Sequence, residues 1–333
     1  MEKFDIQRAK EILEKSKGKA IAVIGDIMLD RYFWGNVSRI SPEAPVPVVD
    51  IERESYHLGG AANVANNLKS LGIEPILCGL LGDDNSGKLF SEIAENQGIS
   101  SIGFFTDKER TTTVKTRVIG NNQQLVRLDR ETRKLISSEG EKFILRILNN
   151  TTNLSGIIFQ DYNKGTISEF LILEVISFAK SNNIPVFVDP KSDNFFNYKE
   201  VTVFKPNRKE ASHALNMNLR ERDILEQAGK TLLERLNAKN VLITLGADGM
   251  ILFESNGNIS SVPTRARNIA DVSGAGDTTI ATLATAFVGG ATIKEAASMA
   301  NFAAGVVCEE PGIVPITIDS LLKSIKRNSI NNG

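Results

Sequence analysis

The sequence predicts an α/β fold whose mostly parallel, doubly wound sheet carries helices on both faces. Short apolar runs that suit buried strands alternate with longer segments that suit helices, which is typical of a parallel sheet. Several of the runs end in polar residues, and in such sheets ligands bind beyond the carboxyl ends of the strands. The chain has 333 residues, 41% of them hydrophobic, so a large core can form. We expect a single domain over residues 1–333.

The composition points away from nucleic acids and membranes. The 39 basic and 40 acidic residues give a net charge of −1 without a basic block, so we expect neither partner. Residues 1–19 are charged and helix-like, and no long apolar run follows. Cys78 and Cys308 lie far apart in apolar sequence, which favours free thiols in a reducing compartment. We therefore expect a cytoplasmic protein that binds a small molecule.

The first predicted strand, Ala20–Gly25, is an apolar run that follows the charged helix. It leads directly into Asp26 and Asp30, which we place beyond the carboxyl end of the strand, where a ligand would bind. Asp30 is the candidate for binding ligand hydroxyl groups. Alternatively, both carboxylates cap the loop.

Residues 31–57 are predicted to form an exposed edge ribbon. Pro42, Pro45 and Pro47 exclude a helix and disfavour a central strand. Thr111–Leu128 alternates β-branched and charged residues around a Gly-Asn-Asn turn, which predicts a hairpin. We expect the two pieces, about residues 31–58 and 108–128, to form one small β lid over a cleft. Such a lid would exclude water, and its free edge would suit a homodimer interface.

A glycine pair opens the next helix. Gly59 and Gly60 precede an Ala/Asn/Leu-rich helix that ends near Gly72. These glycines allow a ligand to approach the backbone closely, and Asn63, one turn into the helix, can hydrogen-bond a hydroxyl group. Close packing of the helix on the sheet is the alternative explanation of the small residues.

The segment Gly82–Leu89 matches the spacing of a P-loop but is not predicted to be one. A leucine stands where a Ser or Thr must bind magnesium, and Asp83 and Asp84 would repel phosphate. A loop and a helix start are expected instead. Zinc hydrolysis and dinucleotide oxidoreduction are also disfavoured, because His57 and His213 are the only histidines and no G-x-G-x-x-G motif occurs.

The remainder of the chain continues the alternation of strands and helices. The expected elements are strand Gly156–Gln160, helix Ile167–Lys180, strands Pro185–Asp189 and Val201–Lys205, helix Arg220–Leu236 and strand Asn240–Leu245. Polar residues follow these strands at Asp161, Asp189–Lys191, Lys205–Glu210 and Thr244–Gly249. We expect them to face one crevice. Asn207 and Glu210 fall on one side of a helix start, where they suit water-mediated magnesium binding or, alternatively, ordinary capping.

The stretch Asp271–Thr279 predicts an anion site. It follows the polar segment Pro263–Ala270 and opens a long run of small and apolar residues that suits a buried helix. At a helix start the amides lack partners and the dipole favours an anion, and Gly274 and Gly276 permit close approach. A carboxylate there repels the anion unless it takes a proton, so Asp277 suggests phosphoryl transfer to a hydroxyl group. The alternative is a capped helix whose first turn carries an Asp.

Four segments together resemble a known family. Gly59–Asn63 and Asp271–Asp277 resemble the two signatures of the ribokinase-like (PfkB-type) carbohydrate kinases. Asn207–Glu210 resembles that family's N-x-x-E element, and Thr244–Gly249 resembles its nucleotide turn. The segments occur in family order across nearly the whole chain. The resemblance implies a ribokinase-like three-layer fold.

The match extends to one branch of the family. Gly25–Tyr32, Ser38–Val48 and Gly59–Asn66 resemble the bacterial D-glycero-β-D-manno-heptose-7-phosphate kinases. The resemblance implies transfer of the ATP γ-phosphoryl group to the anomeric hydroxyl, giving the 1,7-bisphosphate for ADP-heptose and lipopolysaccharide core synthesis. Many relatives carry a second, adenylyltransferase domain, whose H-x-G-H motif is missing here. We therefore expect the kinase alone and a separate enzyme for the nucleotidyl step.

The resemblance also implies roles for individual residues. Asp277 is the expected base, and the amides of Gly274, Ala275 and Gly276 would stabilise the transferring group. The substrate-binding candidates are Asp30, Gly59, Gly60, Asn63 and Asp189, with Lys115, Arg117, Arg31 and Lys191 for the sugar phosphate. The cofactor-binding candidates for ATP are Asn207, Glu210, Thr244, Gly246, Gly249 and Asn301. Glu210 would hold Mg²⁺ through water, and Asp271 would contribute to a K⁺ site. Each basic residue alternatively belongs to a solvated charged face.

Other acceptors and other protein classes are alternatives. A ketohexose phosphate, a pentose or a nucleoside is the alternative acceptor. A non-catalytic regulator on this fold would be expected to lack Asp277, which is present. A phosphatase or nucleotide hydrolase would need no sugar pocket, so ADP release that depends on an added sugar phosphate separates it from a kinase.

Overall fold

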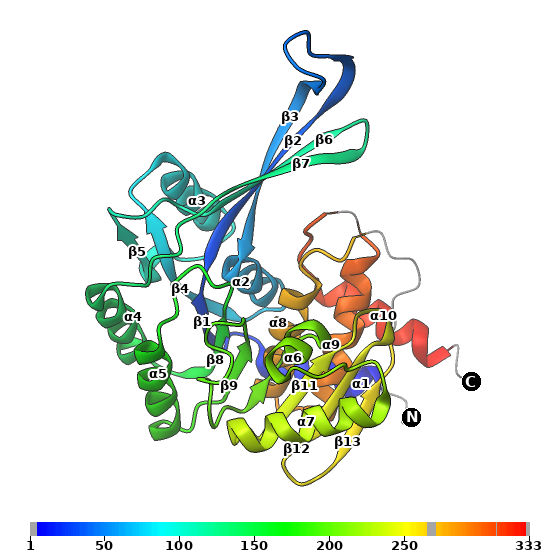
Figure 1. Ribbon diagram of the computed structural model, residues 1–333. Helices are drawn as coiled ribbons and strands as arrows, with labels where there is room; N and C mark the ends of the chain where they lie inside the picture. The colour runs from blue at the N-terminus through cyan, green and yellow to red at the C-terminus, as the bar shows by residue number, and fades with distance from the viewer. Residues whose placement is uncertain (1–4, 265–270, 311, 331–333) are drawn as a thin grey trace.

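The computed structural model describes residues 5–264, 271–310 and 312–330, which form a layered α/β body and a small projecting sheet (Figure 1). The helices are α1 Ile6–Ser16, α2 Ala61–Ser70, α3 Asn85–Asn96, α4 Ser138–Asn150, α5 Glu169–Ser181, α6 Arg208–Leu215, α7 Arg222–Leu236, α8 Ala275–Val288, α9 Ile293–Cys308 and α10 Ile318–Ile330. The strands are β1 Ala20–Gly25, β2 Ile27–Ile40, β3 Pro47–Gly60, β4 Glu74–Gly82, β5 Phe104–Asp107, β6 Val114–Gly120, β7 Gln123–Arg130, β8 Leu154–Gln160, β9 Val186–Asp189, β10 Val203–Phe204, β11 Asn240–Thr244, β12 Met250–Glu254 and β13 Ile259–Val262.

The large sheet, as far as the chain is described, has nine strands in the order β13-β12-β11-β10-β9-β8-β1-β4-β5. The pairs from β5 to β11 are parallel, and β12 and β13 are antiparallel additions at one edge. The strand order reverses at β1, which lies between β4 and β8. Such a reversal opens a crevice beyond the carboxyl ends of the strands. The predicted mostly parallel sheet is therefore confirmed, and its crevice lies beside β1 and β8.

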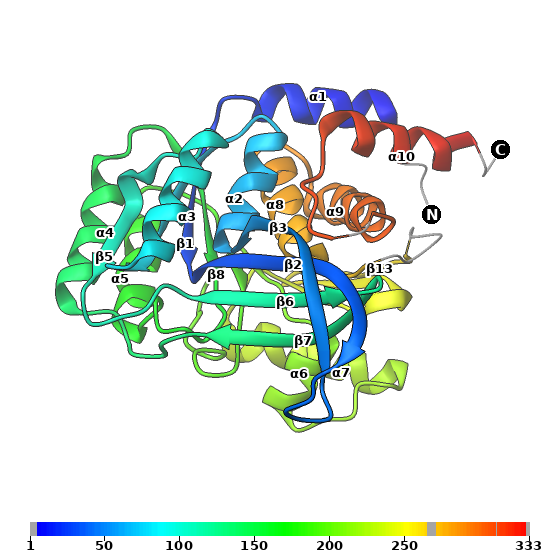
Figure 2. The same cartoon turned by 90° about the horizontal axis from the view of Figure 1, so that it is seen from above.

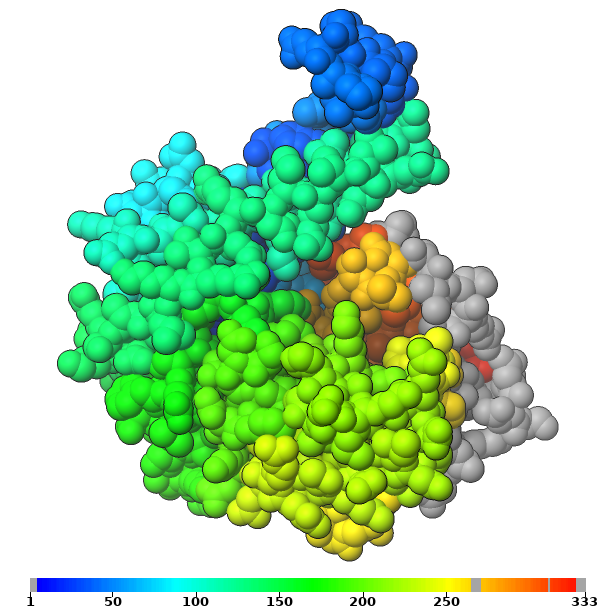
Figure 3. All heavy atoms as spheres, in the orientation of Figure 1, coloured from blue at the N-terminus to red at the C-terminus, as the bar shows by residue number. Residues whose placement is uncertain are grey.

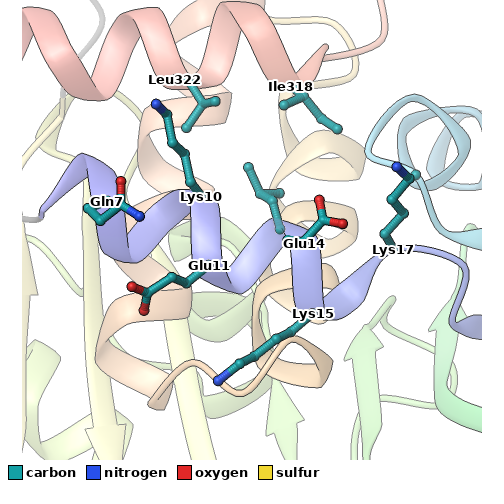
Figure 4. Close-up of a pocket in the computed structure, with 10 residues that line it drawn as sticks. Gln7, Lys10, Glu11, Glu14, Lys15, Lys17, Ile318 and Leu322 are labelled. Atoms are coloured by element: carbon teal, nitrogen blue, oxygen red, sulfur yellow. The ribbon is translucent and has the colours of Figure 1, made fainter.

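Helices cover both faces of this sheet. One apolar cluster joins the sheet to α1, α2, α3, α8, α9 and α10, and a second joins it to α4, α5, α6 and α7. Helix α8 is buried along most of its length, and most of its residues are Ala, Gly or Thr, which are small enough to pack closely on every side. Figure 2 shows α1 and α10 side by side on the outside of the first layer, and an open groove runs between them, with Lys10 and Leu322 extending from the two helices (Figure 4).

The predicted lid is a separate sheet of four described strands in the order β3-β2-β6-β7. It projects from the body, with a hollow beneath β6 and β7 (Figure 3). Asn121 and Asn122 form the turn between β6 and β7 with φ values of +52° and +63°, and Asn is one of the residues that tolerate this conformation. The two pieces predicted from residues 31–58 and 108–128 do pair, through β2 and β6. The first piece is longer than expected, at residues 27–60, whereas the second begins later and ends later, at residues 114–130.

One predicted placement is wrong in detail. Only Asp26 lies in the connection after β1, because the chain enters β2 at Ile27. Asp30 is therefore a lid residue, not a loop residue beyond the first strand. The rejected P-loop segment forms the end of β4 and the start of α3, where the Asp84 side chain accepts the Gly87 amide as an N-cap, as expected. No helix in the described ranges is long and apolar enough to cross a membrane.

Candidate active site

The candidate site is built around the first turn of α8. Gly274 precedes the helix with φ +79°, a left-handed conformation that favours glycine. A Cβ at Gly274 would lie 2.9 Å from Asn63 Nδ2, so the glycine also lets α2 approach. The next turn carries Asp277, which is only 5% exposed. Asn63 and Asp277, which the sequence predicts separately as site residues, thus meet in space.

Asp277 accepts hydrogen bonds from three side chains. Its Oδ1 accepts from Gln160 Nε2 at 3.0 Å and from the Tyr162 hydroxyl at 2.7 Å. Its Oδ2 accepts from Asn63 Nδ2 at 2.8 Å. Burial disfavours the charged form and raises the pKa of Asp277 to about 6, although the Asn63 and Tyr162 donors oppose that shift. A carboxylate with this pKa is largely ionised at neutral pH and still basic enough to accept a proton.

Asn63 is itself held in one orientation by Asn67. Asn67 Nδ2 donates to the Asn63 backbone carbonyl at 2.8 Å and to Asn63 Oδ1 at 3.3 Å. Because the side-chain oxygen of Asn63 faces a donor, its amide nitrogen is left to face Asp277. Asn67 Oδ1 also accepts from the Thr278 hydroxyl at 3.1 Å, which fastens α2 to α8.

A buried ion pair lies beside the start of α8. Lys205 Nζ is 2.9 Å from Asp189 Oδ2, and the two side chains are only 3% and 10% exposed. A Cβ on Gly276 would lie 3.9 Å from Lys205 Nζ, so the ammonium group is close to the first turn. An anion there would meet the helix dipole and Lys205 together. The Ala275 amide, expected to bind the transferring group, instead donates to the Val272 carbonyl at 3.3 Å.

One face of the lid carries Asp30, Lys115 and Arg117. Asp30 pairs in register with Lys115, and Tyr32 pairs with Arg117, so these alternate residues share a face. Arg117 forms an ion pair with Asp30 and lies over the Tyr32 ring, 5.1 Å from its centroid. A Cβ on Gly59 would lie 2.2 Å from Asp30 Oδ2. Gly59 therefore makes room for the Asp30 carboxylate. We call this the inner face of the lid.

Two predicted substrate residues, Arg31 and Gly60, have local structural roles, and their contact with substrate stays a prediction. Arg31 lies on the opposite, outer face of the lid, paired with Glu54 and stacked 4.1 Å from the Phe33 ring centroid. The structure thus does not bring Arg31 to Lys115 and the other predicted phosphate ligands. Gly60 has φ +60°, and a Cβ there would lie 2.3 Å from the Asp26 carbonyl oxygen, so the backbone alone requires this glycine.

Lys115 and Lys191 meet at the ring of Tyr162. Each Nζ is 5.4 Å from the ring centroid, with Lys115 extending from β6 of the lid and Lys191 from the segment after β9. Burial lowers the pKa of Lys115, while the charge of Asp30 opposes this shift. The hydroxyl of the same tyrosine reaches Asp277. Tyr162 therefore contacts the lid at Lys115, the body at Lys191 and the expected base, Asp277.

The predicted nucleotide residues line one pocket. Thr244, Gly246, Gly249 and Asn301 surround a cavity that extends to Gly276 at the start of α8. Asn301 Nδ2 donates to the Pro263 carbonyl at 2.7 Å, which fixes one wall. A nucleotide whose terminal phosphate lies at α8 would occupy such a pocket.

Asn207 and Glu210 form a capping box at the start of α6. Asn207 Oδ1 accepts the Glu210 amide at 2.9 Å, and Glu210 Oε2 accepts the Asn207 amide at 2.8 Å. The capping interpretation is therefore confirmed. Glu210 also pairs with Lys191, and no group of three metal-ligating side chains occurs among the described residues. The role of Glu210 toward magnesium stays a prediction.

Asp271 lies at the other end of the α8 loop. Its Oδ1 accepts the Ser273 amide at 2.8 Å, and its own amide donates to the Cys308 carbonyl at 3.3 Å. Its predicted contribution to a K⁺ site stays a prediction. Residues 265–270, most of the preceding segment that the sequence marks as polar and rich in turns, lie outside the described residues.

Two residues at the site, Gln160 and Tyr162, were not among the predicted site residues, and Lys205 was expected only to face the crevice, without an assigned role. Gln160 and Lys205 each end a predicted strand, and that position was the available signal. Tyr162 follows β8 by two residues and gives no pattern of its own. Gln160 and Tyr162 reach Asp277 only because β8 lies beside the reversal of the sheet.

Comparisons with known proteins agree with this geometry. Residues 19–318 match the pfkB family carbohydrate kinases. The chain is similar to proteins named bifunctional protein HldE, with 42% identity over 304 residues in Geobacter sulfurreducens and 42% over 297 residues in Desulfatibacillum aliphaticivorans. These alignments cover 91% and 89% of this chain, but only 62% and 61% of the relatives. The chain thus spans about three fifths of these relatives' length.

Solved structures show the same fold at lower identity. Escherichia coli phosphofructokinase-2 in complex with potassium superposes with a TM-score of 0.78 at 18% identity, covering 94% of this chain and 99% of that one. Arabidopsis thaliana ribokinase complexed with ribose and ATP gives 0.73 at 21% identity, covering 93% and 99%. The expected ribokinase-like fold is confirmed.

The family match covers almost the whole chain, and the fold agrees with it. Kinases of this family are phosphotransferases that use ATP. The chain therefore belongs to the pfkB family of carbohydrate kinases.

Proposed function

We propose that this protein transfers the γ-phosphoryl group of ATP to the anomeric hydroxyl of D-glycero-β-D-manno-heptose 7-phosphate. The product would be the 1,7-bisphosphate, an intermediate for ADP-heptose and lipopolysaccharide core synthesis. The choice of heptose follows from the resemblance of Gly25–Tyr32, Ser38–Val48 and Gly59–Asn66 to the heptose-7-phosphate kinases. The relatives named HldE match over 91% and 89% of this chain.

One observation carries the proposal: Tyr162 contacts both Lys115 of the lid and the expected base, Asp277. Lys115 Nζ lies 5.4 Å from the Tyr162 ring centroid, and the hydroxyl of that ring lies 2.7 Å from Asp277 Oδ1. An acceptor that reaches Asp277 with one hydroxyl group would place a distal anionic group within reach of Lys115. A sugar phosphate has this combination of groups, whereas ribose and nucleosides lack the anion.

The proposed step uses Asp277 as the base. Its Oδ1 already accepts two donors, whereas Oδ2 accepts one. Because each carboxylate oxygen offers about two acceptor sites, Oδ2 is the oxygen left to take the anomeric proton. The deprotonated oxygen then forms a bond to the γ-phosphorus as the bond to the β-phosphate oxygen breaks, and ADP leaves. Lys205 and the α8 amides that stay available would stabilise the charge on the transferring group.

Two cations belong to the proposal. The Glu210 carboxylate offers oxygen ligands, which Mg²⁺ prefers. Mg²⁺ typically binds one or two protein carboxylates and keeps water and phosphate oxygens as its other ligands. Bound with ATP, Mg²⁺ would neutralise phosphate charge. Asp271 uses Oδ1 for the Ser273 amide, and its other oxygen suits a monovalent cation. The potassium complex of phosphofructokinase-2 is the precedent for K⁺.

We also propose a homodimer formed through the lid. Val126 and Leu128 of β7 are 45% and 56% exposed. They pair in register with Val118 and Thr116, which places them on the outer face with Arg31. Apolar side chains on an unpaired sheet face are typical of an interface.

An acceptor screen tests the activity. ADP release is measured with ATP, Mg²⁺ and one acceptor at a time: heptose 7-phosphate, fructose 6-phosphate, ribose or adenosine. The highest kcat/KM is expected for heptose 7-phosphate, with one anomeric phosphate formed per ADP. A higher value for another acceptor contradicts the substrate, and equal ADP release without any acceptor indicates a nucleotide hydrolase.

A further inference from the structure

Tyr162 lies at the centre of the site without belonging to a motif that the sequence singles out. It follows β8 by two residues, and its hydroxyl donates to Asp277 Oδ1 at 2.7 Å. Burial raises the pKa of Tyr162 well above its ordinary value, and the nearby Asp277 charge adds to the shift. The phenol therefore stays protonated, and a hydrogen-bond donor, throughout the pH range in which Asp277 titrates.

The loop that carries Tyr162 is held by groups other than its hydroxyl. The buried Asp26 carboxylate accepts the amides of Tyr162 at 2.8 Å, Lys164 at 3.0 Å and Thr166 at 3.0 Å. The Ile136 amide donates to the Gly165 carbonyl at 2.8 Å. The loop is thus fixed to β1 on one side and to the segment after β7 on the other. Removing only the hydroxyl should leave the ring in place.

The loop is also fastened to the base of the lid. Arg110, in the segment before β6, donates through Nη1 to the Lys164 carbonyl at 2.9 Å and also contacts the Lys134 carbonyl beyond β7. Lys115 of the lid lies against the Tyr162 ring. A cation at this distance is attracted by the ring face. Tyr162, which donates to Asp277, therefore also contacts the lid, through its ring at Lys115 and through its loop at Arg110.

We propose that Tyr162 is a positioning residue for the base. Its hydroxyl, with Gln160, occupies Oδ1 of Asp277, so that the carboxylate is held deprotonated and Oδ2 is the oxygen that accepts the substrate proton. This inference rests on the proposed role of Asp277 in the reaction. The inference adds Tyr162 to the residues that determine the orientation and protonation of Asp277.

Other charged groups also act on Asp277. Asp189 raises the pKa of Asp277, and Lys205 lowers it, both from the buried pair at the ends of β9 and β10. The charges of Lys191 and Asp277 also interact, and that interaction raises the pKa of Lys191. These charges remain when Tyr162 becomes Phe. The change therefore isolates one hydrogen bond, from a neutral donor to the ionised carboxylate.

The test is the pH profile of kcat for Tyr162→Phe. Losing a donor to the ionised carboxylate should move the acidic limb to higher pH by about one unit, so that the loss of kcat is about tenfold greater on that limb than at pH 8.5. The KM for ATP should not change. A uniform fall in kcat with an unshifted limb, or an unaltered profile, would overturn the inference.

The matched control is Tyr198→Phe. Tyr198 is fully buried, whereas Tyr162 is half-buried, and the Tyr198 hydroxyl donates at 2.7 Å to another carboxylate, Asp161 Oδ2. This variant should keep the wild-type pH limb whatever its effect on the melting temperature. An equal shift in both variants would mean that loop packing, not the bond to Asp277, sets the profile, and would also overturn the inference.

The profiles are recorded with heptose 7-phosphate, or with whichever acceptor the wild type phosphorylates best. Failure of the proposed function is then visible separately. It appears as turnover of the wild type on another acceptor, or as retained activity in Asp277→Asn. Failure of the Tyr162 inference appears only in the comparison of the two tyrosine variants.

Discussion

Asp277 is buried, which raises its basicity, and three hydrogen-bond donors fix its orientation. The change that tests its role is Asp277→Asn, which keeps the shape of the side chain and removes the basic oxygen. We expect kcat to fall by at least about 10²–10⁴-fold, the usual contribution of a general base. The nucleotide pocket is lined by other residues, so ATP binding, measured by calorimetry, should persist. Near wild-type kcat would contradict the base assignment.

The same residue should make stability depend on pH. Burial raises the pKa of Asp277 to about 6 from the ordinary 3.8, so the folded state binds the proton more tightly than the unfolded state. The stabilisation is complete below about pH 4 and is lost as pH rises through about 6, by roughly 3 kcal/mol at pH 7. The free energy of unfolding of the wild type relative to Asp277→Asn should therefore decline between pH 4 and 7. A difference that stays constant in urea titrations would contradict this.

The inner face of the lid should determine affinity for the phosphorylated acceptor. Lys115→Met and Arg117→Met each remove a cation beside Asp30. We expect the KM for the sugar phosphate to rise by about 10–100-fold, as for a lost charge-assisted hydrogen bond, with an unchanged KM for ATP. Arg31→Met is the matched control, because Arg31 lies on the outer face with Glu54. An effect of Arg31→Met as large as the others would contradict the assignment to one face.

For single residues, the sequence predicts a functional role where the neighbouring residues in the chain form a recognisable motif. Asp277 stands out because it is an acid at a glycine-rich helix start, and Asn63 because it follows a glycine pair. Tyr162 and Gln160 are recognisable only once the fold places them beside Asp277, which is 115 and 117 residues away. Arg31 lies on the opposite face from Lys115, because neighbouring residues of a strand point to opposite faces, and the sequence alone does not reveal the register.

Elements were predictable where the period of apolar residues was clear. The buried run Ala20–Gly25 and the small-residue run of α8 appear as expected. The boundary after β1 was not predictable, because β2 begins at Ile27 after a single connecting residue. Two strands of different sheets follow each other without a turn signal. The chain therefore passes from body to lid at Asp26, whose carboxylate also anchors the Tyr162 loop.

The junction of β3 and α2 gives a prediction about packing. A Cβ on Gly59 would lie 2.2 Å from Asp30 Oδ2 and 2.9 Å from Met28 Cγ, closer than atoms can approach. Gly59→Ala should therefore displace Asp30 and raise the KM for the acceptor without changing the KM for ATP. Gly257→Ala is a control for the stability cost of replacing a glycine elsewhere: no heavy atom would lie within 4 Å of its Cβ, and its φ of +92° strains an alanine without any contact to Asp30. An unaltered acceptor KM in Gly59→Ala would contradict the role of Gly59 in making room for Asp30.

Across the whole molecule, the large sheet and the lid supply different parts of one reaction. The ends of β8, β9 and β10 and the start of α8 surround Asp277 with Gln160 and the Lys205–Asp189 pair. The lid supplies Asp30, Lys115 and Arg117 on its inner face. Its contact with the body at Tyr162 joins the two. The outer face of the lid takes no part in this arrangement and is available to a second molecule.

The last prediction concerns that outer face. If it forms the dimer interface, Val126→Glu with Leu128→Glu should place charges in an apolar contact and yield a monomer of 36.3 kDa by light scattering. Phe170→Glu with Leu173→Glu is the matched control, because these side chains are 50% and 58% exposed on α5, away from the lid. The control should stay dimeric. A wild type that is monomeric at micromolar concentration, or a lid variant that remains dimeric, would contradict the interface.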